Sequence, residues 1–239
     1  MVGPLLDEHN CYEARPKEMA NLLSQQYQSV FSTPKESLVE KDIFFPEVDP
    51  AADKVLHEIL PTQDDFIAAI SELSPTAGSG PDGYPAVLLL RCKTELSKPL
   101  TILWKKCLKD GTTPQSLKEA TIIPLHKGNS RGLASNYRPI ALTSHIIKIA
   151  EKVIRKHIIA HMDNNNLFNP SQHGFRAGRS CLSQLIAHFD RILSLIEEGA
   201  NVDVIYLDFA KAFDKVDHSV LLHKLKRFGI QGSVGRWIY

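Results

Sequence analysis

The 239-residue sequence contains no long apolar run. A membrane-spanning helix needs about 20 consecutive apolar residues, and no stretch approaches that length, so we expect no membrane partner. The opening residues, MVGPLLDEHNCYEARP, lack the basic end and apolar stretch of a secretory signal. The four cysteines, at positions 11, 92, 107 and 181, form no C-x-x-C pair and no zinc-binding spacing. We therefore expect reduced thiols in an intracellular protein.

The chain also has little net charge, with a formal value of +1. The balance hides an asymmetry, because residues 1–80 carry 5 Lys and Arg against 14 Asp and Glu, whereas residues 81–239 carry 23 against 13. The second part could meet a polyanion. Charge alone favours the simpler interpretation of an unevenly charged, solvated surface. The composition, 43% hydrophobic and 23% charged, is that of a globular protein with one or two domains.

Apolar periodicity predicts most of the secondary structure. Thr62 is a candidate N-cap, Gly111 a helix end, Ser144 a second cap and Gly199 a second end. Proline and acidic residues mark 32–61 as a linker, whereas glycine and proline mark SPTAGSGPDGYP as a break in regular structure. Helices are expected over 14–31, 62–73, 95–110, 145–162, 181–198 and 219–228. Strands are expected in EATIIPLHKGN, in NYRPIALTS and over 202–209.

Asp208 ends the apolar run VDVIYLD, and this position raises a chemical question. A carboxylate at the end of a buried strand is costly unless its charge is compensated. A divalent metal in a phosphoryl-transfer site, a cap for the next helix and a buried salt bridge each satisfy that requirement. The spacing alone leaves all three open. Asp214 and Asp217 are expected to act locally, in a turn, a cap or an ion pair with a neighbouring lysine.

Phe213, five residues after Asp208 in DFAKAF, adds a family resemblance. The sequence resembles the reverse transcriptases of non-LTR (LINE-type) retrotransposons, and within them the jockey-like group. Five segments carry the likeness in order: VGPLLDE with ANLLSQQYQSVF, GSGPDGYPAVLL, KEATIIPLHKGN with NYRPIALTS, SQHGFRAGRSC and VIYLDFAKAFDKVDH. The resemblance implies an α+β right-hand polymerase fold with fingers and an incomplete palm. Residues 1–61 would form a helical N-terminal extension and linker, and residues 62–239 the polymerase part.

The same resemblance implies a nucleotide site. Nucleotide addition is an in-line displacement in which two metal ions stabilise the attacking and leaving oxygens. Asp208 and the backbone carbonyl of Phe209 would bind Mg²⁺ or Mn²⁺. The triphosphate of a deoxynucleotide would contact the N–H groups of Lys211 and Ala212 and the cations Lys127 and Arg138. The ring of Phe213 would lie beside the sugar and exclude a ribose hydroxyl. The segment PLHKGN departs from the more usual P-K-x-G-K/D pattern, with His126 where a lysine is common.

An RNA template and a DNA primer are the implied nucleic-acid partners. In QHGFRAGRS, the residues expected to contact the template backbone and stack near a base are Gln172, Gly174, Phe175 and Arg176. Without the resemblance, the same stretch is interpreted as a plain glycine-containing loop.

The resemblance stops before the second catalytic motif of the family. Residues 231–234, QGSV, lack the proline before and the L-G-P after that this motif requires, and no (F/Y)-A-D-D motif follows Asp208. We therefore expect this chain alone to be inactive as a polymerase. One alternative is a non-catalytic nucleic-acid-binding or partner-binding remnant of the same fold. Another is an unrelated metal-dependent phosphotransferase, which would favour D-x-D where this chain has Asp208-Phe209-Ala210.

Overall fold

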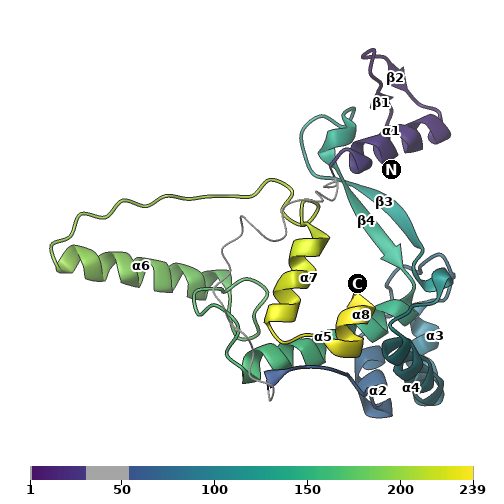
Figure 1. Cartoon of the computed structure of the whole chain (residues 1–239). Helices are drawn as coiled ribbons and strands as arrows, with labels where there is room; N and C mark the ends of the chain where they lie inside the picture. Colours follow the sequence, from purple (N-terminus) through teal and green to yellow (C-terminus); the bar gives the residue numbers. More distant parts are fainter. Residues whose placement is uncertain (1, 31–53, 239) are drawn as a thin grey trace. The chain divides into compact units, whose positions relative to one another are not determined.

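The computed structural model describes residues 2–30 and 54–238 and combines helices with two small antiparallel sheets (Figure 1). Its contacts divide the chain into two compact units, one of residues up to 159 together with 211–239, the other of residues 160–210. A mixed α and β architecture is therefore present. The expected division at residue 61 stays a prediction.

The bounds of the elements follow the sequence order. The strands are β1 (Leu5–Leu6), β2 (Tyr12–Glu13), β3 (Ala120–His126) and β4 (Tyr137–Thr143). The helices are α1 (Pro16–Gln28), α2 (Gln63–Ser71), α3 (Ala86–Arg91), α4 (Lys93–Asp110), α5 (His145–Asn164), α6 (Cys181–Glu197), α7 (His218–Arg227) and α8 (Gly232–Ile238). Two short 3-10 helices cover Gln115–Leu117 and Ala134–Asn136.

The main core of the first unit lies among α2, α3, α4 and the first half of α5. Trp104 of α4 is 1% exposed, and its ring meets Trp237 of α8 edge to face at a centroid distance of 6.2 Å. The other core side chains are Phe66, Ala69, Ile70, Leu89, Leu100, Cys107, Ile147, Ile149, Ala150 and Val153. Burial of these apolar side chains holds the four helices together.

Helix ends in this core confirm the predicted local signals. Thr62 and Asp65 form a capping box at the start of α2. Gly111 ends α4 in the left-handed region, with φ 67°. The Ser144 hydroxyl accepts a hydrogen bond from the Ile146 N–H, as expected of a cap for α5.

The β3–β4 hairpin is the longer of the two sheets and forms where two strands were expected. Its register pairs Ala120 with Thr143 and His126 with Tyr137. In Figure 1 the hairpin leads from the helices of the core to α1 and the N-terminal strands. Tyr137 is buried there with Leu5 and Leu23, so the far end of the hairpin has a small apolar core of its own.

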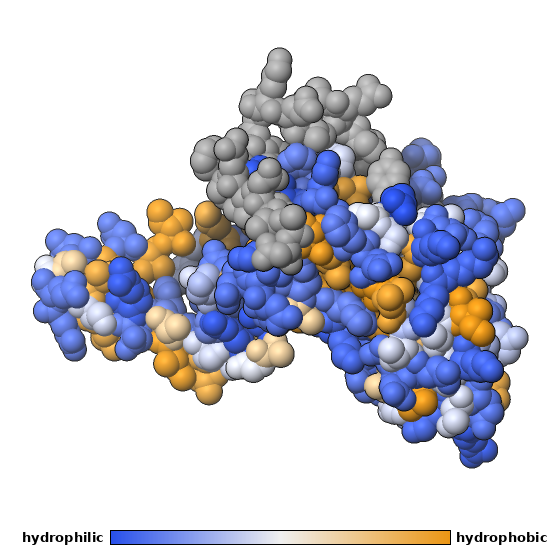
Figure 2. All heavy atoms as spheres, turned by 60° about the horizontal axis from the view of Figure 1, so that its bottom comes forward, coloured by the Kyte–Doolittle hydropathy of each residue, from blue (hydrophilic) through white to orange (hydrophobic). Residues whose placement is uncertain are grey.

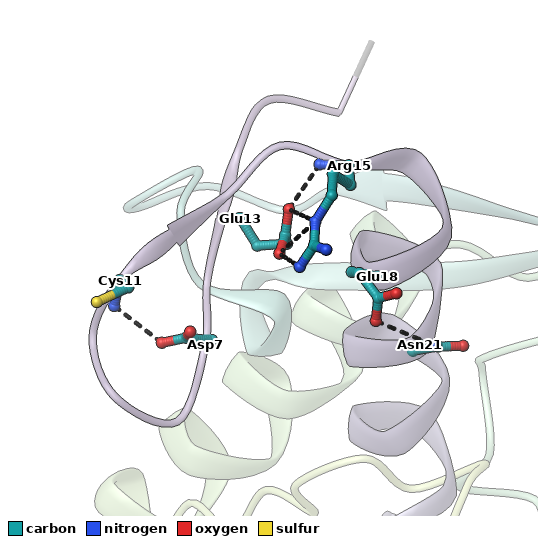
Figure 3. Close-up of polar contacts among 6 residues, drawn as sticks. All are labelled: Asp7, Cys11, Glu13, Arg15, Glu18 and Asn21. Atoms are coloured by element: carbon teal, nitrogen blue, oxygen red, sulfur yellow. Dashed lines mark hydrogen bonds and ion pairs between the residues drawn. The ribbon is translucent and has the colours of Figure 1, made fainter.

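The N-terminal strands and α1 are joined by a salt bridge (Figure 3). Arg15, the residue before α1, donates from Nε and Nη2 to both carboxylate oxygens of Glu13, at 3.0 Å and 2.5 Å. The Arg15 hydrogen bonds lower the pKa of Glu13 to about 2. Asp7 accepts from the Cys11 N–H in the preceding turn, and Asn21 donates to Glu18 on α1.

The second unit contains α6 and an extended segment that was expected to be a strand. Residues 201–209 have no regular secondary structure, so the predicted strand 202–209 is wrong for this structure. A strand is held by ladder hydrogen bonds, and no other segment of residues 2–30 and 54–238 pairs with this one. The segment's apolar side chains are accordingly exposed, for example Leu207 at 88%.

Helix α6 itself is amphipathic and exposes its apolar side. Figure 2 shows apolar side chains at the surface of this part, on the left of the view. They recur at helical spacing and are Leu182, Leu185, Ile186, Phe189, Leu193 and Ile196. None of the described helices is long and apolar enough to span a membrane.

Two helices were not predicted. Helix α3 lies in the run AVLLLR, which is apolar up to its last residue, Arg91, and shows no helical period. Helix α8 contains two glycines, which lower helix propensity. The expected linker 32–61 lies largely outside the described residues. Its last part is packed, because Leu56 forms a parallel bridge to Ile230 and Ile59 is 3% exposed.

Candidate functional site

The β3–β4 hairpin brings Lys127 and Arg138 to the same face. Arg138 lies opposite Leu125 in the register, and the Lys127 N–H donates to the Asn136 carbonyl at 2.8 Å, which extends the ladder by one pair. Side chains alternate between faces along each strand, so Lys127 and Arg138 are diagonal neighbours. Both side chains are exposed. The hairpin therefore presents two cations side by side, a suitable arrangement for a phosphate-rich ligand.

The base of this hairpin is fixed by the glycine-rich segment around Asp82. The Ser144 hydroxyl donates to Asp82 Oδ2 at 2.5 Å, directly after β4. Gly80 lies so close that a Cβ there would be 2.5 Å from the Ser144 nitrogen. From the sequence this segment is a family motif and a break in regular structure. Its contact with Ser144 could not be predicted, because that partner lies 62 residues away.

His145, the first residue of α5, is buried beside this contact, with 1% of its surface exposed. Burial lowers the pKa of His145, and Lys148 lowers it further, whereas Asp82 raises it. A neutral imidazole is the form that such a buried position favours.

Asp208 and Phe209 lie in the extended segment of the second unit and are exposed. Phe209 is 83% exposed. Among residues 2–30 and 54–238, no three Asp, Glu, His or Cys side chains come together in a way that could hold a metal ion. Asp208 and the Phe209 carbonyl, the two groups expected to bind a metal, are fewer ligands than a two-metal centre requires.

Lys211, Ala212 and Phe213 belong to the first unit, in the turn before α7. Lys211 adopts φ 55°, and its carbonyl accepts from the Lys215 N–H at 3.1 Å. Phe213 is 79% exposed. Asp217 caps α7 by accepting from the N–H groups of Ser219 and Val220, so the prediction of a local role is confirmed for this residue.

The four expected template residues lie in the loop between α5 and α6. Gln172 donates to the Gly174 carbonyl at 3.4 Å, and Phe175 is 85% exposed with φ 60°. Arg176 is held differently, by an ion pair to Asp163 at 3.0 Å and by its guanidinium carbon 3.8 Å from the Phe168 ring centre. The sequence pattern did not reveal these two partners of Arg176.

A hollow of about 500 Å³ in the first unit contains none of the expected site residues. Apolar side chains of α7 and α8 line it, with Asp110, Lys226 and Arg236 at its polar positions. The hollow is therefore not taken as the candidate functional site.

Comparison with known proteins identifies the matched region. Residues 125–239 match the family model described as reverse transcriptase (RNA-dependent DNA polymerase). The chain is 26% identical over 165 residues to the probable RNA-directed DNA polymerase from transposon BS of Drosophila melanogaster, covering 69% of this chain and 18% of that protein. It is 31% identical over 129 residues to the RNA-directed DNA polymerase from mobile element jockey of the same fly. That match covers 54% of this chain and 14% of the jockey protein.

A third relative extends the likeness along nearly the whole chain. The RNA-directed DNA polymerase from mobile element jockey of Drosophila funebris is 25% identical over 222 residues, which is 90% of this chain. The chain spans 24% of the length of that protein. The three relatives are therefore about four to seven times as long as the chain's matching part.

Proposed function

We propose, from the match of residues 125–239 to the reverse transcriptase family, that the chain is a segment of the RNA-directed DNA polymerase of a non-LTR retrotransposon. The observation that carries the proposal is the β3–β4 hairpin, which lies partly inside the matched region and places Lys127 and Arg138 on one exposed face. In a right-hand polymerase fold this hairpin belongs to the fingers. Its two cations bind the triphosphate of the incoming deoxynucleotide, Arg138 as a fork and Lys127 as a point charge.

The chemistry of the proposed reaction is transfer of a nucleotidyl group from a deoxynucleoside triphosphate to a DNA primer on an RNA template. Divalent metal ions, Mg²⁺ or Mn²⁺, supply charge stabilisation at the phosphorus in such enzymes. Asp208 and the Phe209 carbonyl are the groups of this chain that hold them, and the remaining ligands come from the longer polypeptide. Lys211 and Ala212 donate backbone N–H groups to the triphosphate.

The other expected residues act on the sugar and the template. The Phe213 ring occupies the space beside the sugar C2′ and discriminates against ribonucleotides. The loop with Gln172, Gly174 and Phe175 contacts the template strand, and Arg176 belongs to the same loop. The template and the deoxynucleotide carry phosphate charge. Residues 81–239 contain 23 basic and 13 acidic residues, so their net charge is suited to such partners.

A second function has one observation in its favour. It is a non-catalytic remnant of the same fold, and the 23 basic against 13 acidic residues of 81–239 favour nucleic-acid binding whether or not catalysis occurs. The two functions differ in whether Asp208 matters to catalysis once the following polypeptide is supplied.

The test joins this chain to the segment that follows the match in the jockey relative. Primer extension on an RNA template is measured with Mg²⁺ and the four deoxynucleotides, together with primer–template affinity. Asp208→Asn is expected to abolish nearly all extension with little loss of affinity, because a metal-binding carboxylate acts mainly on the transition state.

Asp217→Asn is the matched control. It removes a carboxylate nine residues away, and asparagine also caps helices. Extension should survive in this variant. Full extension by Asp208→Asn would show that the carboxylate has no catalytic role and would favour the non-catalytic remnant.

A further inference from the structure

The α5–α6 loop, residues 165–180, contains two arginines whose charges are used differently. Arg176 and Arg179 stand three positions apart in QHGFRAGRS. Periodicity and composition do not distinguish them. Both were expected among the cations that face nucleic acid, and only Arg176 was assigned to the template contact itself. Arg176 and Arg179 differ in the contacts that each forms within the second unit.

The charge of Arg176 is compensated inside the protein. Its Nη2 lies 3.0 Å from Asp163 Oδ1 at the end of α5, and its guanidinium stacks on Phe168. The side chain is 21% exposed, and Nη1 is buried. A guanidinium that already neutralises a carboxylate releases few counterions on meeting a phosphate. Arg176 thus fastens the loop to α5.

Arg179 is exposed, and its charge is not compensated by a carboxylate in the described part of the chain. Its Nη1 lies 3.0 Å from Nε2 of His173, and His173 Nδ1 lies 2.8 Å from the Ser183 hydroxyl in the first turn of α6. No acidic side chain of the described part of the chain forms a salt bridge with Arg179. The guanidinium has further N–H groups besides the one at His173, and a guanidinium suits a planar, bidentate oxygen ligand.

The hydrogen bonds of this network assign a donor or acceptor role to each ring nitrogen of His173. The single Ser183 hydroxyl hydrogen is donated to the Ser180 carbonyl at 2.9 Å, and the same oxygen accepts from the Ser180 N–H. Ser183 must therefore accept from His173, which places a hydrogen on Nδ1. Nε2 must accept from Arg179, because a guanidinium only donates. In this arrangement His173 accepts from Arg179 at Nε2 and donates from Nδ1 to Ser183, so it orients the Arg179 guanidinium.

We propose that Arg179 is the phosphate contact of the α5–α6 loop, that His173 on Ser183 is its positioning residue, and that Arg176 fixes the loop. The ligand is a single-stranded polyanion of the template class. Phe175, 85% exposed and directly before Arg176 in the sequence, presents a ring on which a base can stack. This inference rests on the proposed function, since it assigns roles within the proposed template contact.

The test measures binding of a fluorescent single-stranded RNA to the 239-residue chain over a salt series. Each phosphate contact on a single strand contributes a slope of about −0.7 in a log–log plot. Arg179→Gln should reduce the slope by about 0.7 and weaken binding. Arg176→Gln should leave the slope unchanged while speeding hydrogen exchange in residues 165–180. Arg191→Gln, which removes the same charge from an exposed position on α6, is the matched control and should change neither.

Two further variants keep the test informative if one substitution unfolds the chain. Arg179→Lys retains the charge and should retain the slope. His173→Ala should weaken RNA binding several-fold, and His173→Gln, whose carbonyl oxygen can accept from Arg179, should restore part of it. Nitrogen-15 chemical shifts should report an unprotonated Nε2 on His173.

The possible failures are distinguishable. A wild-type chain that is folded by circular dichroism but binds no RNA at low salt overturns the proposed template contact as a whole. Salt-dependent binding with a slope lost in Arg176→Gln and kept in Arg179→Gln overturns only the division of roles. A protonated Nε2 on His173 overturns the positioning network.

Discussion

The Asp82 carboxylate and the Ser144 hydroxyl are joined by a hydrogen bond of 2.5 Å that connects the glycine-rich segment to the end of the β3–β4 hairpin. The same hydroxyl accepts from the Ile146 N–H, so one side chain both caps α5 and receives the segment around residue 80. Because Lys127 and Arg138 lie on the hairpin, this contact helps to set the position of both proposed phosphate ligands.

Gly80 provides the sharpest test of that junction. A Cβ at Gly80 would lie 2.5 Å from the Ser144 nitrogen and 2.6 Å from the Thr143 carbonyl carbon, both backbone atoms that cannot move aside alone. Gly80→Ala should therefore lower the free energy of unfolding by about 1–3 kcal/mol. The measurement is urea unfolding followed by circular dichroism.

Gly78→Ala is the control in the same segment. A Cβ at Gly78 would meet only the Leu142 Cδ1 atom, at 3.6 Å, which is an ordinary contact. Its unfolding free energy should change little or rise slightly, because alanine restricts the unfolded chain. Equal effects of the two substitutions would mean that the close approach at Gly80 is unimportant.

Asp65 is expected to make the stability of the first unit depend on pH. Burial raises the pKa of Asp65, but hydrogen bonds from Lys156 and Thr62 and the Lys156 charge outweigh it, and the pKa falls to about 2. Because this folded-state pKa lies below the unfolded value near 4, the carboxylate stabilises the fold above about pH 4. That contribution, about 1–2 kcal/mol after allowance for solvent screening, is lost as the pH falls toward 2.

Urea unfolding at pH 6, 4 and 3 measures the Asp65 contribution when the wild type is compared with Asp65→Asn. The wild type should lose more unfolding free energy on acidification than the variant, since asparagine does not titrate. Lys156→Met should reduce the difference, because it removes the 2.9 Å hydrogen bond and salt bridge. Parallel pH profiles for wild type and Asp65→Asn would exclude this role.

The predictions that the structure confirmed depend on neighbours in the sequence. Thr62 bonds to Asp65 three residues later, Gly111 follows the last turn of its own helix, and Asp217 caps the residues directly after it. The side-chain chemistry of such signals is complete within one turn. They can therefore be recognised from sequence alone.

The features that were missed depend on partners distant in the sequence. The strand expected over 202–209 has a suitable apolar pattern, but a strand also needs a hydrogen-bonded neighbour, and β-propensity does not supply one. Asp82 meets Ser144 only after 62 residues of chain have folded between them. The tautomer of His173 follows from three hydrogen bonds at Ser183, and a residue pattern contains no information about them.

Phe213 offers a test of sugar selection in the polypeptide extended with the jockey segment. Phe213→Ala should narrow the preference for deoxynucleotides over ribonucleotides by about 10- to 100-fold, the usual size of a steric pocket effect. The measurement is the ratio of single-nucleotide incorporation rates. Phe213→Tyr keeps the ring and should keep the ratio. An unchanged ratio in Phe213→Ala would remove this side chain from sugar selection.

The 239-residue chain by itself is expected to bind nucleic acid without extending a primer. Two metal ions held for an in-line transfer need several carboxylates on rigid elements, and Asp208 lies in an extended segment with no such cluster among the described residues. The assay begins with proof of a folded monomer by size-exclusion chromatography and circular dichroism, because the apolar side of α6 is exposed and could cause association. Primer extension on RNA is then measured with Mg²⁺ and with Mn²⁺, using the extended polypeptide as the positive control. Template-dependent extension by the short chain, lost in Asp208→Asn, would show that these residues assemble a working site unaided.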